Sequence, residues 1–213
     1  MNRSAWLVAG GAILLQGCVT AHQYQPPYAP PPANNVKLID RPRDAVWAST
    51  IPAIGSQFFV INNIDKASGL MNISYTGDPQ QYVDCGYVTV KTEGASGPDM
   101  NLTFPAAKGS VTYQHLQVMD RWQVRRNLTL DGRVNLIFEE TSPTQTRVTA
   151  NTRYVLNRSV NATAAGKYPQ SFSDQISFSS GQSGAFEPRS SDSQRTTCIP
   201  TGAMERAVLD LVK

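Results

Sequence analysis

Gln114-His-Leu-Gln-Val-Met-Asp-Arg-Trp-Gln-Val-Arg-Arg-Asn-Leu-Thr-Leu130 is the stretch of sequence that decides the fold of this chain. Most of its apolar side chains fall on one side of an extended backbone, at Leu116, Val118, Trp122, Val124, Leu128 and Leu130. The other side carries polar residues, at Gln123, Arg125, Asn127 and Thr129. Successive side chains of a strand point to opposite faces, so this period of two predicts a half-buried antiparallel strand.

Further strands are expected on both sides of this stretch, at residues 36–40, 58–64, 70–76, 86–91, 133–140 and 145–156. Asp131-Gly132 indicates a hairpin turn before the strand at 133–140. A two-residue loop there would set the apolar residues of one strand against the polar residues of the next. We therefore predict a three-residue loop, Leu130-Asp131-Gly132, with a positive φ at Gly132, where a side chain is disfavoured.

Two helices are expected at the ends of the folded region. Pro42 suits a first helical turn, and the helix after it has an apolar stripe at Trp47, Ile51, Ile54 and Phe58. Pro52 should kink or shorten this helix, and Gly55 should end it. The second helix follows Thr201 as its N-cap, with apolar residues at Met204, Val208, Leu211 and Val212.

A sheet with one apolar face needs a cover, which two helices can supply. We therefore expect an α+β fold, an antiparallel sheet packed on an N-terminal and a C-terminal helix, similar in element order to the helix-grip fold. One such domain would span residues 36–213. Residues 157–197 are rich in Ser and Gly and are expected to form a long loop with one short strand at 175–179; loops of that length tend to be functional or mobile.

The N-terminus has the features of an export signal over residues 1–17. Arg3 precedes an apolar run from Ala5 to Leu15, and these 11 residues are too few to cross a bilayer, which takes roughly 20. The following Leu15-Gln-Gly-Cys18 resembles the lipobox of bacterial lipoproteins. That resemblance implies cleavage before Cys18, lipid on its sulfur and amino group, and delivery to the outer membrane with the domain facing the periplasm. An ordinary secretory signal with a chance cysteine is the alternative.

Residues 18–35 would then form the lipidated cysteine and a Pro-rich tether, because five prolines fall between Tyr24 and Asn35. Such sequence favours polyproline II at about 3.1 Å per residue, so the tether could hold the domain up to roughly 50 Å from the membrane. A second interpretation is a docking peptide for a partner, with Tyr24 and Tyr28 as its contact residues.

Charge and cysteines limit the function classes. The net charge of +3 falls to +2 when Arg3 is removed with the signal. The sequence has no basic stripe of the kind that would indicate a nucleic-acid-binding protein. Cys85 and Cys198 are expected to pair, since export leads through an oxidising compartment. Their separation of 113 residues would make the disulfide worth about 4 to 5 kcal/mol in the entropy model. The alternative is two independent buried thiols, and zinc has too few ligands.

No catalytic constellation is evident. The two histidines fall at His22 in the tether and His115 in a strand, so no nucleophile has a base predicted nearby. Gly181-Gln-Ser-Gly184 lacks the spacing of a nucleophile elbow. Glu139 and Glu140 are adjacent on a strand and point to opposite faces. We therefore expect no enzymatic activity, no cofactor and no metal site.

One set of basic residues could form an interaction face. They share the polar parity of neighbouring strands, at Arg121, Arg125, Arg133, Arg147 and Arg153. An arginine-bearing sheet face is either simply solvated or adhesive toward an acidic partner, such as lipopolysaccharide phosphates, peptidoglycan carboxylates or an acidic protein.

Three stretches resemble a family of proteobacterial lipoproteins. They are Arg43-Asp-Ala-Val-Trp47, Asp65-Lys-Ala-Ser-Gly-Leu70 with Tyr75, and Cys198-Ile-Pro-Thr-Gly-Ala-Met-Glu205. With the lipobox and tether they are similar to BamC-like lipoproteins, relatives of an accessory component of the machinery that assembles outer-membrane β-barrels. That component has a long unstructured arm and two helix-grip domains, whereas this chain has a short arm and room for one domain.

These observations lead to two expectations about function. The first is a non-enzymatic outer-membrane lipoprotein that acts as a scaffold or accessory subunit of a cell-envelope complex, with an envelope protein as partner. The alternative is a carrier of lipid or a small apolar ligand, which would use a cavity between sheet and helix lined by Trp47, Phe58, Trp122 and Phe138.

Overall fold

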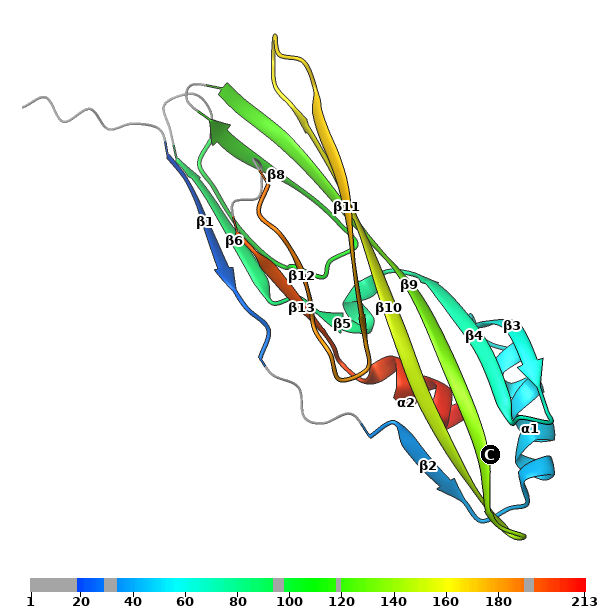
Figure 1. Cartoon of the computed structure of the whole chain (residues 1–213). Helices are drawn as coiled ribbons and strands as arrows, with labels where there is room; N and C mark the ends of the chain where they lie inside the picture. The colour runs from blue at the N-terminus through cyan, green and yellow to red at the C-terminus, as the bar shows by residue number, and fades with distance from the viewer. Residues whose placement is uncertain (1–18, 29–33, 94–97, 118–119, 190–193) are drawn as a thin grey trace, which may run out of the picture.

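The structure is a computed structural model that describes residues 19–28, 34–93, 98–117, 120–189 and 194–213. Figure 1 shows an elongated molecule built around two long antiparallel strands. These are β9 (Asp120–Ser142) and β10 (Gln145–Thr163), which pair along almost their whole length. The other strands of the central sheet are arranged around this pair.

The central sheet has seven strands. Along its main path the order is β11-β10-β9-β4-β3, while β2 pairs with the opposite end of β10 from β11, and β8 pairs with the opposite end of β9 from β4. The added strands are β2 (Val36–Ile39), β3 (Val60–Asp65), β4 (Leu70–Gly77), β8 (Ser110–Gln117) and β11 (Gln170–Ser179). All of these pairings are antiparallel.

Two smaller sheets and two helices complete the described fold. One sheet has the order β1-β6-β7, from β1 (Val19–Gln25), β6 (Tyr87–Glu93) and β7 (Met100–Pro105). The other has the order β12-β13-β5, from β5 (Val83–Asp84), β12 (Gly184–Phe186) and β13 (Thr196–Pro200). The helices are α1 (Arg43–Gly55) and α2 (Ala203–Leu211), with a 3₁₀ turn, η1 (Pro79–Gln81).

The expected α+β class, with one sheet packed on two terminal helices, is therefore wrong. The structure is about 60% strand and 14% helix in three sheets, so strands rather than helices make up most of its layers. Length gives the reason. The 23 residues of β9 extend for about 75 Å, whereas the 13 residues of α1 and the 9 of α2 reach about 20 and 14 Å. Two short helices cannot cover so long a sheet.

The buried face of the long sheet accordingly has two cores. The helix-covered core lies under α1 and α2 and includes Trp47, Ile54, Phe138, Met204 and Val208. The sheet-covered core lies between the long sheet and β1-β6-β7, and it consists of Val90, Phe104, Val111, Tyr113, Trp122, Val124, Val160 and Ala162. The second core has the layout of a β-sandwich, which the sequence analysis did not anticipate.

Two buried arginines mark the boundary between these cores. Arg126 falls between Val124 and Leu128 on the inward face of β9, and Arg158 is 2% exposed on the inward face of β10. The Arg158 guanidinium donates two hydrogen bonds to the Asp174 carboxylate, from Nε to Oδ1 at 2.9 Å and from Nη2 to Oδ2 at 2.7 Å. Arg126 lies over the ring of Phe104, 5.3 Å from its centroid. Buried and exposed residues continue to alternate through both positions, but the buried residue there is a charged one instead of an apolar one.

The hairpin predicted at Asp131-Gly132 is also wrong. Strand β9 runs through Gly132, which is not among the glycines with positive φ. A Cβ at Gly132 would lie 2.7 Å from both Sδ and Cε of Met204, so this glycine makes room for α2. The strand expected at 114–130 is instead divided between β8 and β9, which pair from Ser110↔Asn127 to Gln117↔Asp120. Val118 lies outside the described residues.

Three further expectations need correction. Phe58 does not extend the stripe of α1, which ends at Gly55, because its side chain is 90% exposed. The loop expected at 157–197 contains the end of β10, the strands β11 and β12 and the start of β13. Residues 19–25 of the expected tether form β1, which pairs with β6 from Val19↔Glu93 to Gln25↔Tyr87.

Candidate functional site

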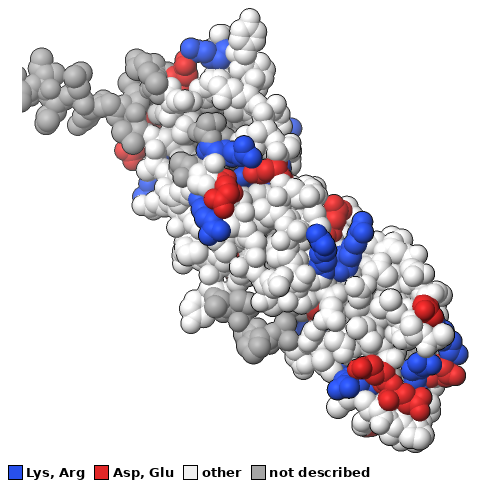
Figure 2. Space-filling view, in the orientation of Figure 1, with Lys and Arg blue, Asp and Glu red and all other residues white. Residues whose placement is uncertain are grey.

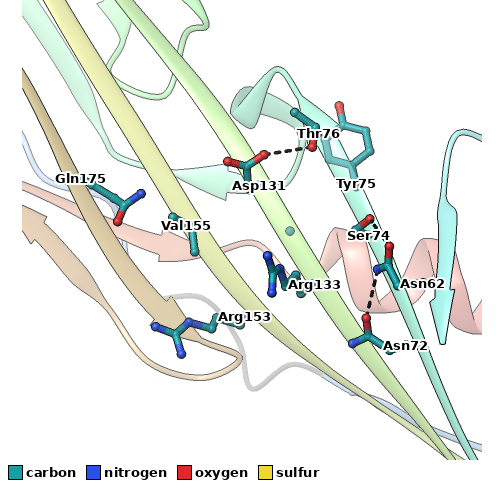
Figure 3. A pocket seen from close by; sticks show the side chains of 11 residues that line it. Asn62, Asn72, Ser74, Tyr75, Thr76, Asp131, Arg133, Arg153, Val155 and Gln175 are labelled. Carbon is teal, nitrogen blue, oxygen red and sulfur yellow. Dashed lines mark hydrogen bonds between the residues drawn. The ribbon is translucent and has the colours of Figure 1, made fainter.

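The outward face of the long sheet has a polar groove of about 730 Å³ at its centre. It crosses five strands, and Figure 3 shows the side chains that line it, among them Asn62, Asn72, Ser74, Asp131, Arg133, Arg153 and Gln175. Odd-numbered residues of β9 and β10 point outward here because the two strands keep one register through this region. The strand alternation therefore places these polar groups together.

Two arginines form the positive centre of the groove. Arg133 and Arg153 are directly opposite each other across β9 and β10, and Ser74 of β4 flanks Arg133 on the other side. Like charges opposite each other on a sheet face destabilise it. Among the described residues, no acidic side chain makes an ion pair with either of them. An anion bound between them would offset the repulsion.

The nearest acidic residue of the groove has neutral partners. Asp131 accepts hydrogen bonds from the Thr76 hydroxyl at 2.9 Å and from the Asn157 amide at 3.0 Å. Arg153 donates only a long hydrogen bond of 3.5 Å to the Ser177 hydroxyl. Both guanidinium groups are exposed and available to a ligand.

The other three predicted arginines lie on the same outward parity but far from this pair. Arg147 is paired with Glu139, with Nε–Oε2 at 2.9 Å. Arg121 donates to the Pro98 carbonyl at 3.1 Å and to the Gln114 side chain. Since Arg147 is opposite Glu139, the 18 residues of β9 between positions 121 and 139 separate the ends of the set by about 60 Å. The five residues share a face without forming one patch.

Figure 2 shows the same separation on the molecular surface. Charged side chains of both signs gather at the two ends of the visible face, and a pair of basic side chains stands in a mostly uncharged middle stretch. The two basic side chains of the middle stretch therefore stand apart from the mixed charges toward the two ends.

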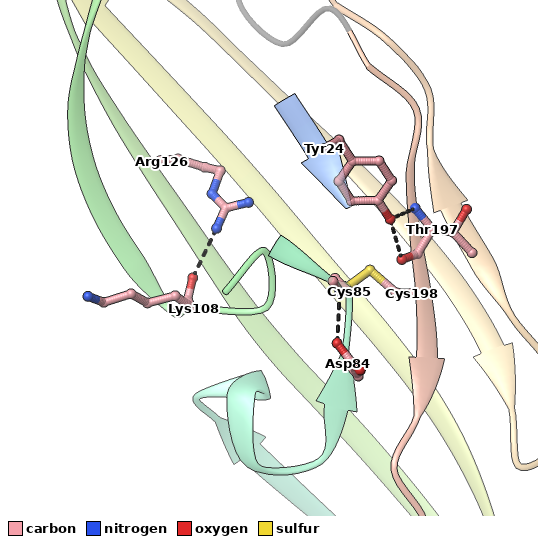
Figure 4. Close-up of a disulfide and its surroundings, with 8 residues drawn as sticks. Tyr24, Asp84, Cys85, Lys108, Arg126, Thr197 and Cys198 are labelled. Carbon is pink, nitrogen blue, oxygen red and sulfur yellow. Dashed lines mark hydrogen bonds between the residues drawn. A yellow bond between two sulfur atoms is a disulfide. The ribbon is translucent and has the colours of Figure 1, made fainter. Parts of the chain in front are cut away.

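The structure joins Cys85 and Cys198 in a disulfide, with Cα atoms 4.0 Å apart (Figure 4). The bond links the end of β5 to β13, and both residues are fully buried. Next to it, Tyr24 of β1 donates its hydroxyl hydrogen to the Thr197 carbonyl at 3.0 Å and accepts from the Thr197 N–H at 2.9 Å. The disulfide thus lies where β1 and the small sheets meet the helix-covered core.

A buried polar cluster was missed by the sequence analysis. Glu205 of α2 is fully buried and accepts hydrogen bonds from Tyr154 at 2.8 Å and from the Ser180 hydroxyl at 2.6 Å. Burial raises the pKa of Tyr154, and the nearby Glu205 charge raises it further. The helical period could have indicated that Glu205 is buried, because it places Glu205 one turn before Val208 and Leu209 on the buried side of α2. This arrangement holds the helix against the sheet.

The two histidines of the chain also meet unexpectedly. Nε2 of His22 lies 3.1 Å from Nδ1 of His115, between β1 and β8. Burial lowers the pKa of His115, and the charge of His22 lowers it further. Among the described residues, no group of three or more His, Cys, Asp or Glu side chains could hold a metal ion.

Cys18 lies outside the described residues, one position before β1. Within the described part of the chain, no helix has the length and apolar character that crossing a membrane requires. No family model matches the chain, and neither does any curated protein or solved structure.

Proposed function

We propose that this chain is an outer-membrane lipoprotein, anchored through Cys18, that acts as a non-enzymatic scaffold or accessory subunit of a cell-envelope complex. Its partner is a protein that places an acidic segment in the polar groove. The observation that carries this proposal is the cross-strand pair of Arg133 and Arg153, with neither of which an acidic side chain of the described residues makes an ion pair.

The chemistry of the groove favours an acidic segment. Guanidinium groups bind carboxylates through two parallel hydrogen bonds, which gives geometric as well as electrostatic selectivity. Asn72, Ser74 and Gln175 add neutral hydrogen-bonding groups around the two cations. A groove that crosses five strands and remains open suits an extended chain rather than an enclosed small molecule.

The test is an affinity pull-down of the full chain from membranes after mild crosslinking. Arg133→Gln with Arg153→Gln should remove a stoichiometric partner that the wild-type chain retains, and raised salt should weaken the same contact. Arg125→Gln is the matched control, because Arg125 is an exposed arginine on the same face and opposite Asn161. Equal recovery of the partner by the double variant and the control would contradict the proposal, as would recovery of the wild-type chain alone.

The carrier function is not favoured by the positions of the aromatic residues. Trp47 and Phe138 pack edge to face, with ring centroids 5.0 Å apart, in the helix-covered core. Trp122 belongs to the sheet-covered core, and Phe58 is exposed. The four side chains therefore do not surround a common cavity.

A further inference from the structure

The start of β1 and the loop between β10 and β11, residues 164–169, lie at the same end of the molecule (Figure 1). This placement matters because Val19, the first residue of β1, directly follows Cys18. Val19 is already in register with Glu93 of β6. A lipid on Cys18 would therefore hold this end of the folded body at the membrane, with no free tether between them.

A chain of contacts connects the anchor strand to that loop. The Leu116 N–H donates to the Thr20 hydroxyl at 2.7 Å, and Leu116 pairs with Arg121 at the start of β9. The preceding residue, Asp120, makes an ion pair with Lys167 at 3.0 Å. β8 and the start of β9 thus lie between the anchor strand and the ion pair of the loop.

The composition of the loop suits a membrane surface. Its sequence is Ala164-Ala-Gly-Lys-Tyr-Pro169, with small residues, one aromatic side chain and no acidic residue. Tyr168 is 94% exposed, so its ring is not packed against the protein. Tyrosine is enriched at membrane interfaces because its ring is apolar while its hydroxyl remains hydrated. Because Asp120 offsets the charge of Lys167, a contact between this loop and a membrane would depend on the ring of Tyr168.

We propose that this loop is a membrane-contact element, with Tyr168 seated at the lipid headgroups beside the lipidated Cys18. The proposal rests on the lipid anchor of the proposed function. One tyrosine binds lipid weakly, but an anchor at the same end of the molecule supplies a high effective concentration. Two attachment points would fix the orientation of the long sheet and keep the opposite end, with α1 and β3, away from the membrane.

The test uses residues 18–213, which include every described element, with Cys18 coupled to a maleimide phospholipid. Cys18 is the one free thiol of this chain, since Cys85 and Cys198 are bonded. The anchored protein is placed in phosphatidylethanolamine and phosphatidylglycerol vesicles that contain brominated acyl chains. Tyr168→Trp should add emission that is blue-shifted and largely quenched. Phe58→Trp, an equally exposed site at the opposite end, should add emission that is not quenched.

The outcomes separate this inference from the proposed function. Equal quenching at the two positions, or none at position 168, would overturn the membrane-contact element. Palmitate labelling of the full chain in cells tests the anchor itself, and labelling that is absent or unchanged by Cys18→Ala would overturn the proposed lipoprotein. The vesicle experiment still decides the geometry in that case, because its lipid is attached chemically.

Discussion

The helices that cover one half of the long sheet and the strand β1 that helps to cover the other half are positioned by different kinds of contact. Under the helices, large apolar side chains such as Trp47, Ile54 and Val208 are buried. At the other end, the inward residues of β1 are polar. Thr20 accepts from the Leu116 N–H, His22 meets His115, and Tyr24 bonds Thr197 in both directions. β1 is therefore positioned by hydrogen bonds, whereas the helices are positioned mainly by apolar packing.

This difference indicates that the two halves differ in how they respond to solvent conditions. Apolar burial depends little on pH, while hydrogen bonds between titratable groups depend on it directly. Under the proposed function, β1 directly follows the lipid anchor, so this pH-sensitive contact would lie near the membrane.

The largest expected effect is at the boundary between the two halves. Arg158→Met should destabilise the fold by about 3 to 4 kcal/mol, because Asp174, whose side chain is 14% exposed, would lose its bidentate partner and keep only the longer contact with Arg189 at 3.8 Å. Urea unfolding measures the loss. The double variant Arg158→Met with Asp174→Leu should recover part of it, since no unpaired charge then remains.

Arg153→Met is the control, because it changes an exposed arginine of the same strand and should alter stability by about 0.5 kcal/mol or less. Equal effects at positions 153 and 158 would show that the buried pair does not stabilise the boundary. A second unfolding transition in Arg158→Met alone would show that this pair couples the two cores.

The next effect concerns the disulfide that joins the two halves. Cys85 lies two residues before the start of β6, and Cys198 lies five residues before the start of α2. The bond therefore connects the small sheet that covers one half of the long sheet to the helices that cover the other half. Cys85→Ala with Cys198→Ala should lower the unfolding free energy by about 2 to 4 kcal/mol, because it releases a constraint on the unfolded chain. Reduction of the wild-type chain should have a similar effect, and reduction of the double variant should have none. A loss confined to one half would contradict a joint role.

Sequence patterns predicted several local features of the chain. The alternation of β9, the stop of α1 at Gly55 and the buried residues Met204 and Val208 of α2 are local features, because each depends on spacing along one element. The sheet-covered half depends on pairing between distant segments. Nothing local indicates that residues 19–25 pair with residues 87–93, and the prolines that follow this segment favoured a tether.

The groove was predicted only in part, for a related reason. Parity placed Arg133 and Arg153 on one face, but their direct opposition depends on the register between β9 and β10, which no local pattern fixed. Gly132 was interpreted as a turn residue, whereas its role is to accommodate Met204 from a helix 72 positions later in the sequence. Such a packing requirement leaves no pattern in the neighbouring residues.

The smallest expected effect tests the pH sensitivity of the sheet-covered half. The pKa of His115 is lowered from 6.5 by burial and by His22, so at mildly acid pH the unfolded chain binds more protons than the folded chain. Stability should therefore be fully present above pH 6.5 and decline as the pH falls below it, by about 1 kcal/mol or less because the site is half-buried.

Unfolding by urea between about pH 5 and pH 8 measures this slope, because Asp65, whose pKa is lowered from 3.8, titrates outside that range. His115→Gln should flatten the profile, since the two histidines are the only side chains of the chain that ordinarily titrate there. His22→Gln should reduce the slope less, because it removes the smaller of the two causes of the shift and leaves the burial of His115. An unchanged slope in His115→Gln would show that β1 is not held by a pH-sensitive contact, and the two halves would then differ in geometry but not in their response to acid.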